Sequence, residues 1–191
     1  MSKGRMEAFS DAVVAILLTI MVLELKVPHE AGWDALQPLW PVFSSYVLSF
    51  VNLGIYWNNH HHLLQASERV NGRVLWANLH LLFWLSLFPF TTGWMGENHF
   101  ARTPTAVYGV VLLAAALAYY LLQLMVLREH GPDSVLAQAL GRDIKGKISP
   151  AIYVAGIALS LVSRWVGLAL YVVVALMWLV PDRRLEARVN A

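Results

Sequence analysis

The sequence predicts an all-α integral membrane protein with six transmembrane helices. Hydrophobic residues make up 58% of the 191 residues and charged residues only 14%, whereas about a quarter of the residues of a soluble domain are charged. The apolar residues gather in blocks of about 20, the length that crosses a bilayer. Eight tryptophans and seven tyrosines suit the interfacial belts of a membrane protein. The net charge of +2 does not indicate nucleic-acid binding, and the absence of cysteine excludes disulfides and cysteine metal sites.

Prolines and changes in polarity mark the first three spans. The first is expected at about 6–27, because Pro28 ends the apolar run. The second is expected at about 36–59, with two prolines in its first turns, where proline is tolerated. The third is expected at about 73–94, with a bend at Pro89 near its outer end.

The remaining apolar residues predict three further spans. The fourth is expected at about 104–127 and begins with a proline, which is favoured at the first position of a helix. The last apolar block is too long for one helix, and Arg164 interrupts it. We therefore expect a tight hairpin of two short spans at about 148–163 and 166–180.

Lysine and arginine counts predict how the spans are oriented. The six expected spans form a single domain, residues 1–191, and place eleven basic residues on one side of the membrane and three on the other. Basic residues are enriched on the cytoplasmic side, so both termini are expected in the cytoplasm. The cytoplasmic set is Lys3, Arg5, Arg69, Arg73, Arg128, Arg142, Lys145, Lys147, Arg183, Arg184 and Arg188, and the outer set is Lys26, Arg102 and Arg164.

One stripe of the first span is a candidate functional surface. At about 100° per residue, its members all fall within about 60° of Ile16. They are Ala12, Ile16, Thr19, Ile20 and Leu23. Two interpretations are open: the stripe packs against a neighbouring helix or lipid, or it lines a symmetric pore in which apolar rings narrow the path and Thr19 offers a hydroxyl to a partly dehydrated ion.

Asp11 lies on the opposite side of this helix and needs a partner, because a carboxylate within a membrane span is costly. Glu7 is a like charge one turn away, so the partner should come from another helix. We expect a buried network that joins the first three spans, and a proton-carrying role for Asp11 is the alternative. The candidate partners are Asn58, Asn59, His60, His61, His62, Asn78 and His80.

The three adjacent histidines, 60–62, do not predict a metal site. Neighbouring side chains on a helix point about 100° apart and cannot converge on one ion. A structural role is favoured, with one or two histidines bonded to Asp11 or Ser10. The sequence contains no GxSxG, HExxH, Walker A or dinucleotide-binding motif. No catalytic residue, organic substrate or organic cofactor is therefore expected.

Three motifs on three consecutive spans resemble those of one family. Residues 5–11 match the RxxxFSD signature of the transmembrane protein 175 family of potassium channels, through Arg5, Phe9, Ser10 and Asp11. Residues 57–61 (WNNHH) resemble the WxxHH element that closes its second span. Residues 78–90 resemble the NLxLLF…PF element of its third span.

The resemblance implies four copies of the six-helix unit around a central pore lined by the first helix, so that this one-unit chain is expected to form a homotetramer. It implies a constriction at Ile16, a selectivity-linked hydroxyl at Thr19 and further apolar pore positions at Ile20 and Leu23. It also implies a structural role for the motif arginine, serine and aspartate. Position 15, a serine in some members, is alanine here.

We therefore expect a potassium-preferring cation channel in a prokaryotic plasma membrane, conducting passively, with potassium near Thr19 as its only metal ion. Two other functions remain open from the sequence. One is a proton-coupled transporter that uses Asp11 and His60 to His62. The other is a non-conducting membrane scaffold in which the stripe only packs.

Overall fold

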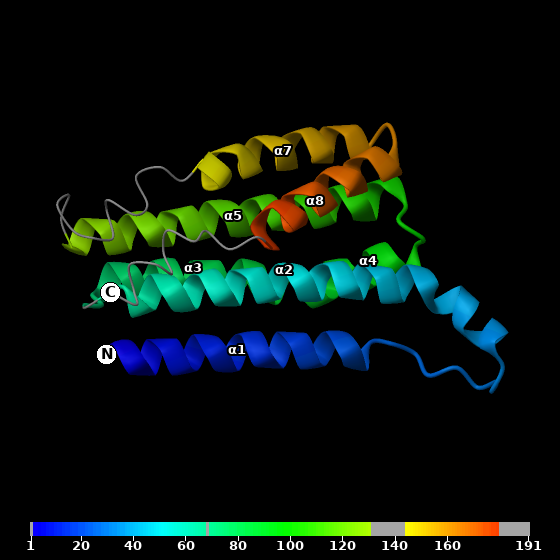
Figure 1. Cartoon of the computed structure of the whole chain (residues 1–191), viewed down its shortest axis with the longest axis horizontal. Coiled ribbons are helices and arrows are strands. Elements are labelled where there is room, and N and C mark those ends of the chain that lie inside the picture. Colours follow the sequence, from blue (N-terminus) through cyan, green and yellow to red (C-terminus); the bar gives the residue numbers. More distant parts are fainter. Residues whose placement is uncertain (1, 68, 131–143, 180–191) are drawn as a thin grey trace.

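The computed structural model describes residues 2–67, 69–130 and 144–179, and every regular element in these ranges is a helix (Figure 1). This confirms the predicted all-α fold. The elements, in chain order, are α1 (Lys3–Leu23), the 3₁₀ helix η1 (Trp33–Leu39), α2 (Trp40–Gln65), α3 (Gly72–Ser86), α4 (Phe88–Glu97), α5 (Arg102–His130), α7 (Ile144–Ser160) and α8 (Arg164–Leu179).

Within the described residues, four segments are long and apolar enough to cross a membrane. They are α1, η1 with α2, α3 with α4, and α5. The two remaining helices, α7 and α8, have 17 and 16 residues. They are therefore about 24–26 Å long, slightly shorter than the ~30 Å hydrocarbon core of a bilayer.

The third expected span, 73–94, is not one helix in the structure. It is divided into α3 and α4, which meet at Leu87. The cause is Pro89, which has no backbone N–H to donate to the carbonyl four residues earlier and whose ring collides with that turn. The N–H of Leu87 bonds instead to the carbonyl of Trp84 at 3.3 Å, which closes a tighter turn. The expected bend is therefore a break, located two residues before the proline.

Helices α7 and α8 form a hairpin around the three residues 161–163. Small residues let the two backbones approach closely, as is common between helices in membranes. A Cβ atom added at Gly167 would lie 2.4 Å from Cβ of Ser160 and 2.7 Å from the carbonyl oxygen of Gly156. Gly167 is therefore required by close packing.

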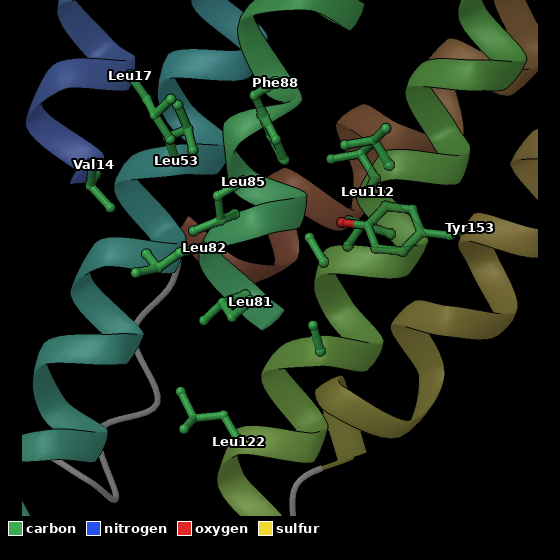
Figure 2. Close-up of a cluster of buried hydrophobic side chains, with 14 of the residues drawn as sticks. Val14, Leu17, Leu53, Leu81, Leu82, Leu85, Phe88, Leu112, Leu122 and Tyr153 are labelled. Atoms are coloured by element: carbon green, nitrogen blue, oxygen red, sulfur yellow. The ribbon is translucent and has the colours of Figure 1, made fainter. Parts of the chain in front are cut away.

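Helix α1 lies at the edge of the bundle against α2, α3 and α4. It begins at the end of the bundle at which α5 finishes, and α8 runs toward the same end (Figure 1). Figure 2 shows Leu17 of α1 directed toward Leu53 of α2, with Leu82 and Leu85 projecting from α3. Because lipid tails are as apolar as leucine, such contacts act mainly through van der Waals packing. The core therefore positions α1 through close fit.

Candidate functional site

Helix α1 has one face packed into the bundle and one face uncovered. The buried residues recur every three or four positions and are Met6, Ser10, Val14, Leu17 and Met21. The sequence-predicted stripe is centred about 140° away on the helix. All five of its residues are exposed in the single chain, and Ile16, Ile20 and Leu23 are 55%, 39% and 81% exposed. Among the described residues, no other part of the chain therefore covers this stripe.

Thr19 is the polar group in the middle of this uncovered stripe. Its hydroxyl donates to the carbonyl oxygen of Ile16 at 2.8 Å, within the same helix. Since the hydrogen is used in that bond, the oxygen keeps its lone pairs for another donor or for a cation. The stripe thus combines apolar side chains with one hydroxyl oxygen.

The packed face of α1 carries a buried chain of hydrogen bonds that reaches α3 and then α2. The Asn78 side-chain N–H donates to Oγ of Ser10 at 2.9 Å, and Nε2 of His60 lies 2.7 Å from Oδ1 of Asn78. Ser10 in turn donates to the carbonyl of Met6 at 2.9 Å. Because Asn78 uses its N–H group toward Ser10, its oxygen must accept, so the proton resides on Nε2 of His60. The three side chains are 1–5% exposed, and we call them the Ser10–Asn78–His60 chain.

Asp11 has a partner that the sequence interpretation did not include. Its Oδ1 accepts a hydrogen bond from the indole N–H of Trp57 at 3.0 Å, whereas the expected partners were asparagines and histidines. One turn along each helix, Oε1 of Glu7 lies 3.3 Å from Nδ1 of His61. The rings of Trp57 and His61 are stacked, with their centres 6.2 Å apart. The antiparallel helices α1 and α2 thus meet through two pairs of residues, each pair one turn from the other. Trp57, the tryptophan of the WNNHH segment, forms one of these pairs with Asp11.

Other candidate residues lie apart from this contact. Arg5 and Phe9 are exposed, and neither makes a side-chain hydrogen bond or ion pair within the described residues. His80 accepts a bond from the indole of Trp84 at 2.9 Å on its own helix. Asn59 donates to the carbonyl of Ile55 on its own helix, at 2.9 Å.

The histidine segment does not gather around one point. His60 is directed to Asn78 on α3, whereas His61 is directed to Glu7 on α1. In the part of the chain that the structure describes, no three histidine, aspartate or glutamate side chains are placed to hold a metal ion. The site therefore consists of an uncovered stripe and a polar attachment on the opposite face.

A second buried polar cluster was not foreseen. Oγ of Ser49 on α2 lies 2.6 Å from Oγ1 of Thr92 on α4 and 3.0 Å from the hydroxyl of Tyr108 on α5. All three side chains are buried. The hydroxyls of Ser49 and Thr92 lie on apolar stretches, where the sequence alone does not reveal that they share one contact. This cluster links α2, α4 and α5 inside the bundle.

Comparisons with known proteins agree on one family. The family model described as "Endosomal/lysosomal potassium channel TMEM175" matches residues 5–89, which include the stripe and the polar contacts of α1. A potassium channel of Chryseobacterium sp. (strain P1-3) is 53% identical over 186 residues, covering 97% of each chain. A potassium channel of Chamaesiphon minutus is 31% identical over 190 residues, covering 91% of each chain.

A solved structure has the same arrangement of helices. It is the crystal structure of a lysosomal potassium-selective channel TMEM175 homolog from Chamaesiphon minutus. It superposes with a TM-score of 0.80 at 29% sequence identity, and the match covers 99% of this chain and 98% of the other. The similarity therefore extends over all the described helices.

Proposed function

Since this chain belongs to the TMEM175 family of potassium channels, we propose that it conducts potassium passively through a pore lined by the exposed stripe of α1. Four copies of the chain surround that pore. Helices α7 and α8 cross the membrane as a hairpin, which gives six spans and cytoplasmic termini in a prokaryotic plasma membrane. Family membership and the exposed stripe support this assembly.

The observation that carries the proposal is the contrast between the two faces of α1. The packed face is attached to α2 and α3 by directional bonds, namely the Ser10–Asn78–His60 chain and the bond from Trp57 to Asp11. A slip of one residue would rotate the helix by about 100° and break all of these bonds. These bonds therefore fix the rotation of α1 about its axis, and with it the direction in which Ile16 and Thr19 point away from the rest of the protomer.

The chemistry of the stripe suits a selective apolar constriction. A ring of four Ile16 side chains would strip water from an entering cation, and Thr19 follows about 4.5 Å further along the axis. Its oxygen, with the hydrogen already used by the Ile16 carbonyl, compensates part of the lost hydration. Potassium is dehydrated at lower cost than sodium, so this arrangement favours potassium. Ala12, Ile20 and Leu23 form the rest of the wall.

Selectivity in this proposal rests on one hydroxyl ring. The sequence has no carbonyl filter of the TVGYG type, and Ala15 adds no second hydroxyl. We therefore propose a preference for potassium over sodium rather than strict selection. No catalytic residue or organic cofactor takes part.

A proton-coupled transporter is less well supported. That function needs Asp11 and the histidines to share a site, whereas Asp11 is bonded to an indole that does not titrate and the histidines diverge. A passive channel also predicts different kinetics from a carrier. Its flux follows the potassium gradient and needs no proton gradient.

Flux through purified protein in liposomes tests the proposal. Ile16→Asn should widen and wet the constriction and increase potassium flux several-fold. Val22→Asn is the matched control, because Val22 is also exposed on α1 but lies about 120° from Ile16. Equal effects of the two substitutions, a monomer by native mass measurement, or flux that requires a proton gradient would each contradict the proposal.

A further inference from the structure

A groove of about 370 Å³ lies between the start of α2, the connection from α4 to α5 and the start of α8. Figure 1 shows these three segments at the same end of the bundle, opposite to the end at which α1 begins. By the expected orientation this is the outer end. The groove is separate from the exposed stripe of α1, and no stripe residue lines it.

The guanidinium group of Arg164 lies at the polar end of the groove and is held in place there. Nη1 of Arg164 donates to the carbonyl of His99 at 3.1 Å, and its guanidinium carbon lies 5.0 Å from the centre of the Trp165 ring. Trp165 also contacts Phe100, with ring centres 5.8 Å apart. His99 and Phe100 have φ angles of 50° and 58°, so two consecutive left-handed residues present that carbonyl. The arginine is held from two sides.

The guanidinium has unused capacity. Arginine carries five N–H groups, and among the described residues Arg164 makes one hydrogen bond. No acidic side chain is among the described residues that line the groove. Arg164 is therefore a positioned cation with free donors and no carboxylate to neutralise it there.

The other end of the groove is apolar. Leu48 on α2 and Val172 on α8 are each eight residues beyond the start of their helices, with Leu168 between the two ends of the groove. Eight residues of helix correspond to about 12 Å, and one leaflet contributes about 15 Å of hydrocarbon. With Arg164 at the headgroup level, a groove of this length would reach through most of the depth of one leaflet.

We propose that this groove binds a phospholipid of the outer leaflet. The phosphate accepts paired hydrogen bonds from Arg164, a geometry in which arginine excels. Trp40 and Trp165, which are 67% and 57% exposed, flank the headgroup at the interface. One acyl chain lies along Leu48, Leu168 and Val172. The bound lipid fills the space between α2 and the α7–α8 hairpin.

Native mass spectrometry of the delipidated protein tests this site. The probes are phosphatidylglycerol and a diacylglycerol with the same acyl chains, which lacks the phosphate. We expect phosphatidylglycerol to bind about tenfold more tightly than the diacylglycerol. Arg164→Gln should remove that difference, and Arg164→Lys should restore only part of it. Arg102→Gln is the matched control, because Arg102 is on the same side but does not line the groove.

Three results of these binding measurements would overturn the proposal. The first is equal affinity for the two lipids, and the second is unchanged phosphatidylglycerol affinity in Arg164→Gln. The third is that inorganic phosphate alone binds at Arg164 and abolishes the preference for phosphatidylglycerol, which would indicate an anion site without a lipid. If Arg164→Gln fails to fold, Leu168→Trp decides, because it fills the apolar part with the arginine intact and should weaken phosphatidylglycerol binding. If a second copy of the chain covers the groove, the assembled protein would bind no lipid there, and the proposal would be wrong.

Discussion

Removing Asn78 should reveal how firmly α1 is held. Asn78→Leu keeps a similar volume but deletes the bonds to Ser10 and His60. Hydrogen bonds between helices in membranes contribute about 0.6 kcal/mol each. The N–H of His60 is then left unpaired in a buried place, which adds about 1–3 kcal/mol. The free energy of unfolding should therefore fall by about 2–4 kcal/mol.

A double-mutant cycle separates the hydrogen-bond chain from simple packing. Ser10→Ala alone should cost about 1–2 kcal/mol, because it leaves the Asn78 N–H unpaired. In the Asn78→Leu background the same change should cost almost nothing, since Ser10 then bonds only within its own helix. The assay is unfolding in bicelles at a fixed protein concentration, because the apparent stability of an oligomer depends on the concentration of its protomers. The exposed Gln37→Leu serves as control, because the Gln37 side chain makes no hydrogen bond within the described residues, and it should change stability by less than about 0.5 kcal/mol. Fully additive costs for Ser10 and Asn78 would refute the reasoning.

Three other substitutions test separate features. Thr19→Ala should lower the potassium-to-sodium permeability ratio about two- to fivefold, equivalent to a loss of about 0.5–1 kcal/mol, whereas Thr19→Ser should not; unchanged reversal potentials under bi-ionic conditions would exclude the hydroxyl from selectivity. Trp57→Phe removes the indole donor to Asp11 and should lower the free energy of unfolding by about 1 kcal/mol, and no loss of stability would show that this bond is dispensable. Gly167→Val should destabilise the α7–α8 hairpin by about 1–3 kcal/mol by overpacking, whereas Gly93→Ala, where an added Cβ meets no atom within 4 Å, should be neutral in the same melting experiment.

The stripe of α1 could be predicted from sequence because the grouping of its residues on one face depends only on the rotation per residue of a helix. Residues such as Ile16 and Thr19 share a face whatever the rest of the chain does. The same arithmetic placed Asp11 on the other side, where the structure has it. Predictions of this kind depend on local geometry and carry over directly to the structure.

Partners between helices are harder to predict, because they depend on how two helices rotate and slide against each other. The partner of Asp11 is Trp57, whose indole N–H is easily overlooked on an aromatic side chain. A pairing signal was nevertheless present. Glu7 and Asp11 are one turn apart, as are Trp57 and His61, so two antiparallel helices can satisfy both pairs at once. The division of the third span at Leu87 likewise depends on how far before Pro89 the helix can continue.

The central claim, that the exposed stripe of α1 forms the ion path, can be tested with single cysteines, because the chain has none of its own. Silver ions resemble potassium in charge and size and bind thiolates almost irreversibly. Potassium flux in liposomes should be blocked by silver in Ile20→Cys and Ala12→Cys, and should be unaffected in Val22→Cys and in the unmodified protein. Block in Val22→Cys without block in Ile20→Cys would place the ion path elsewhere and contradict the claim.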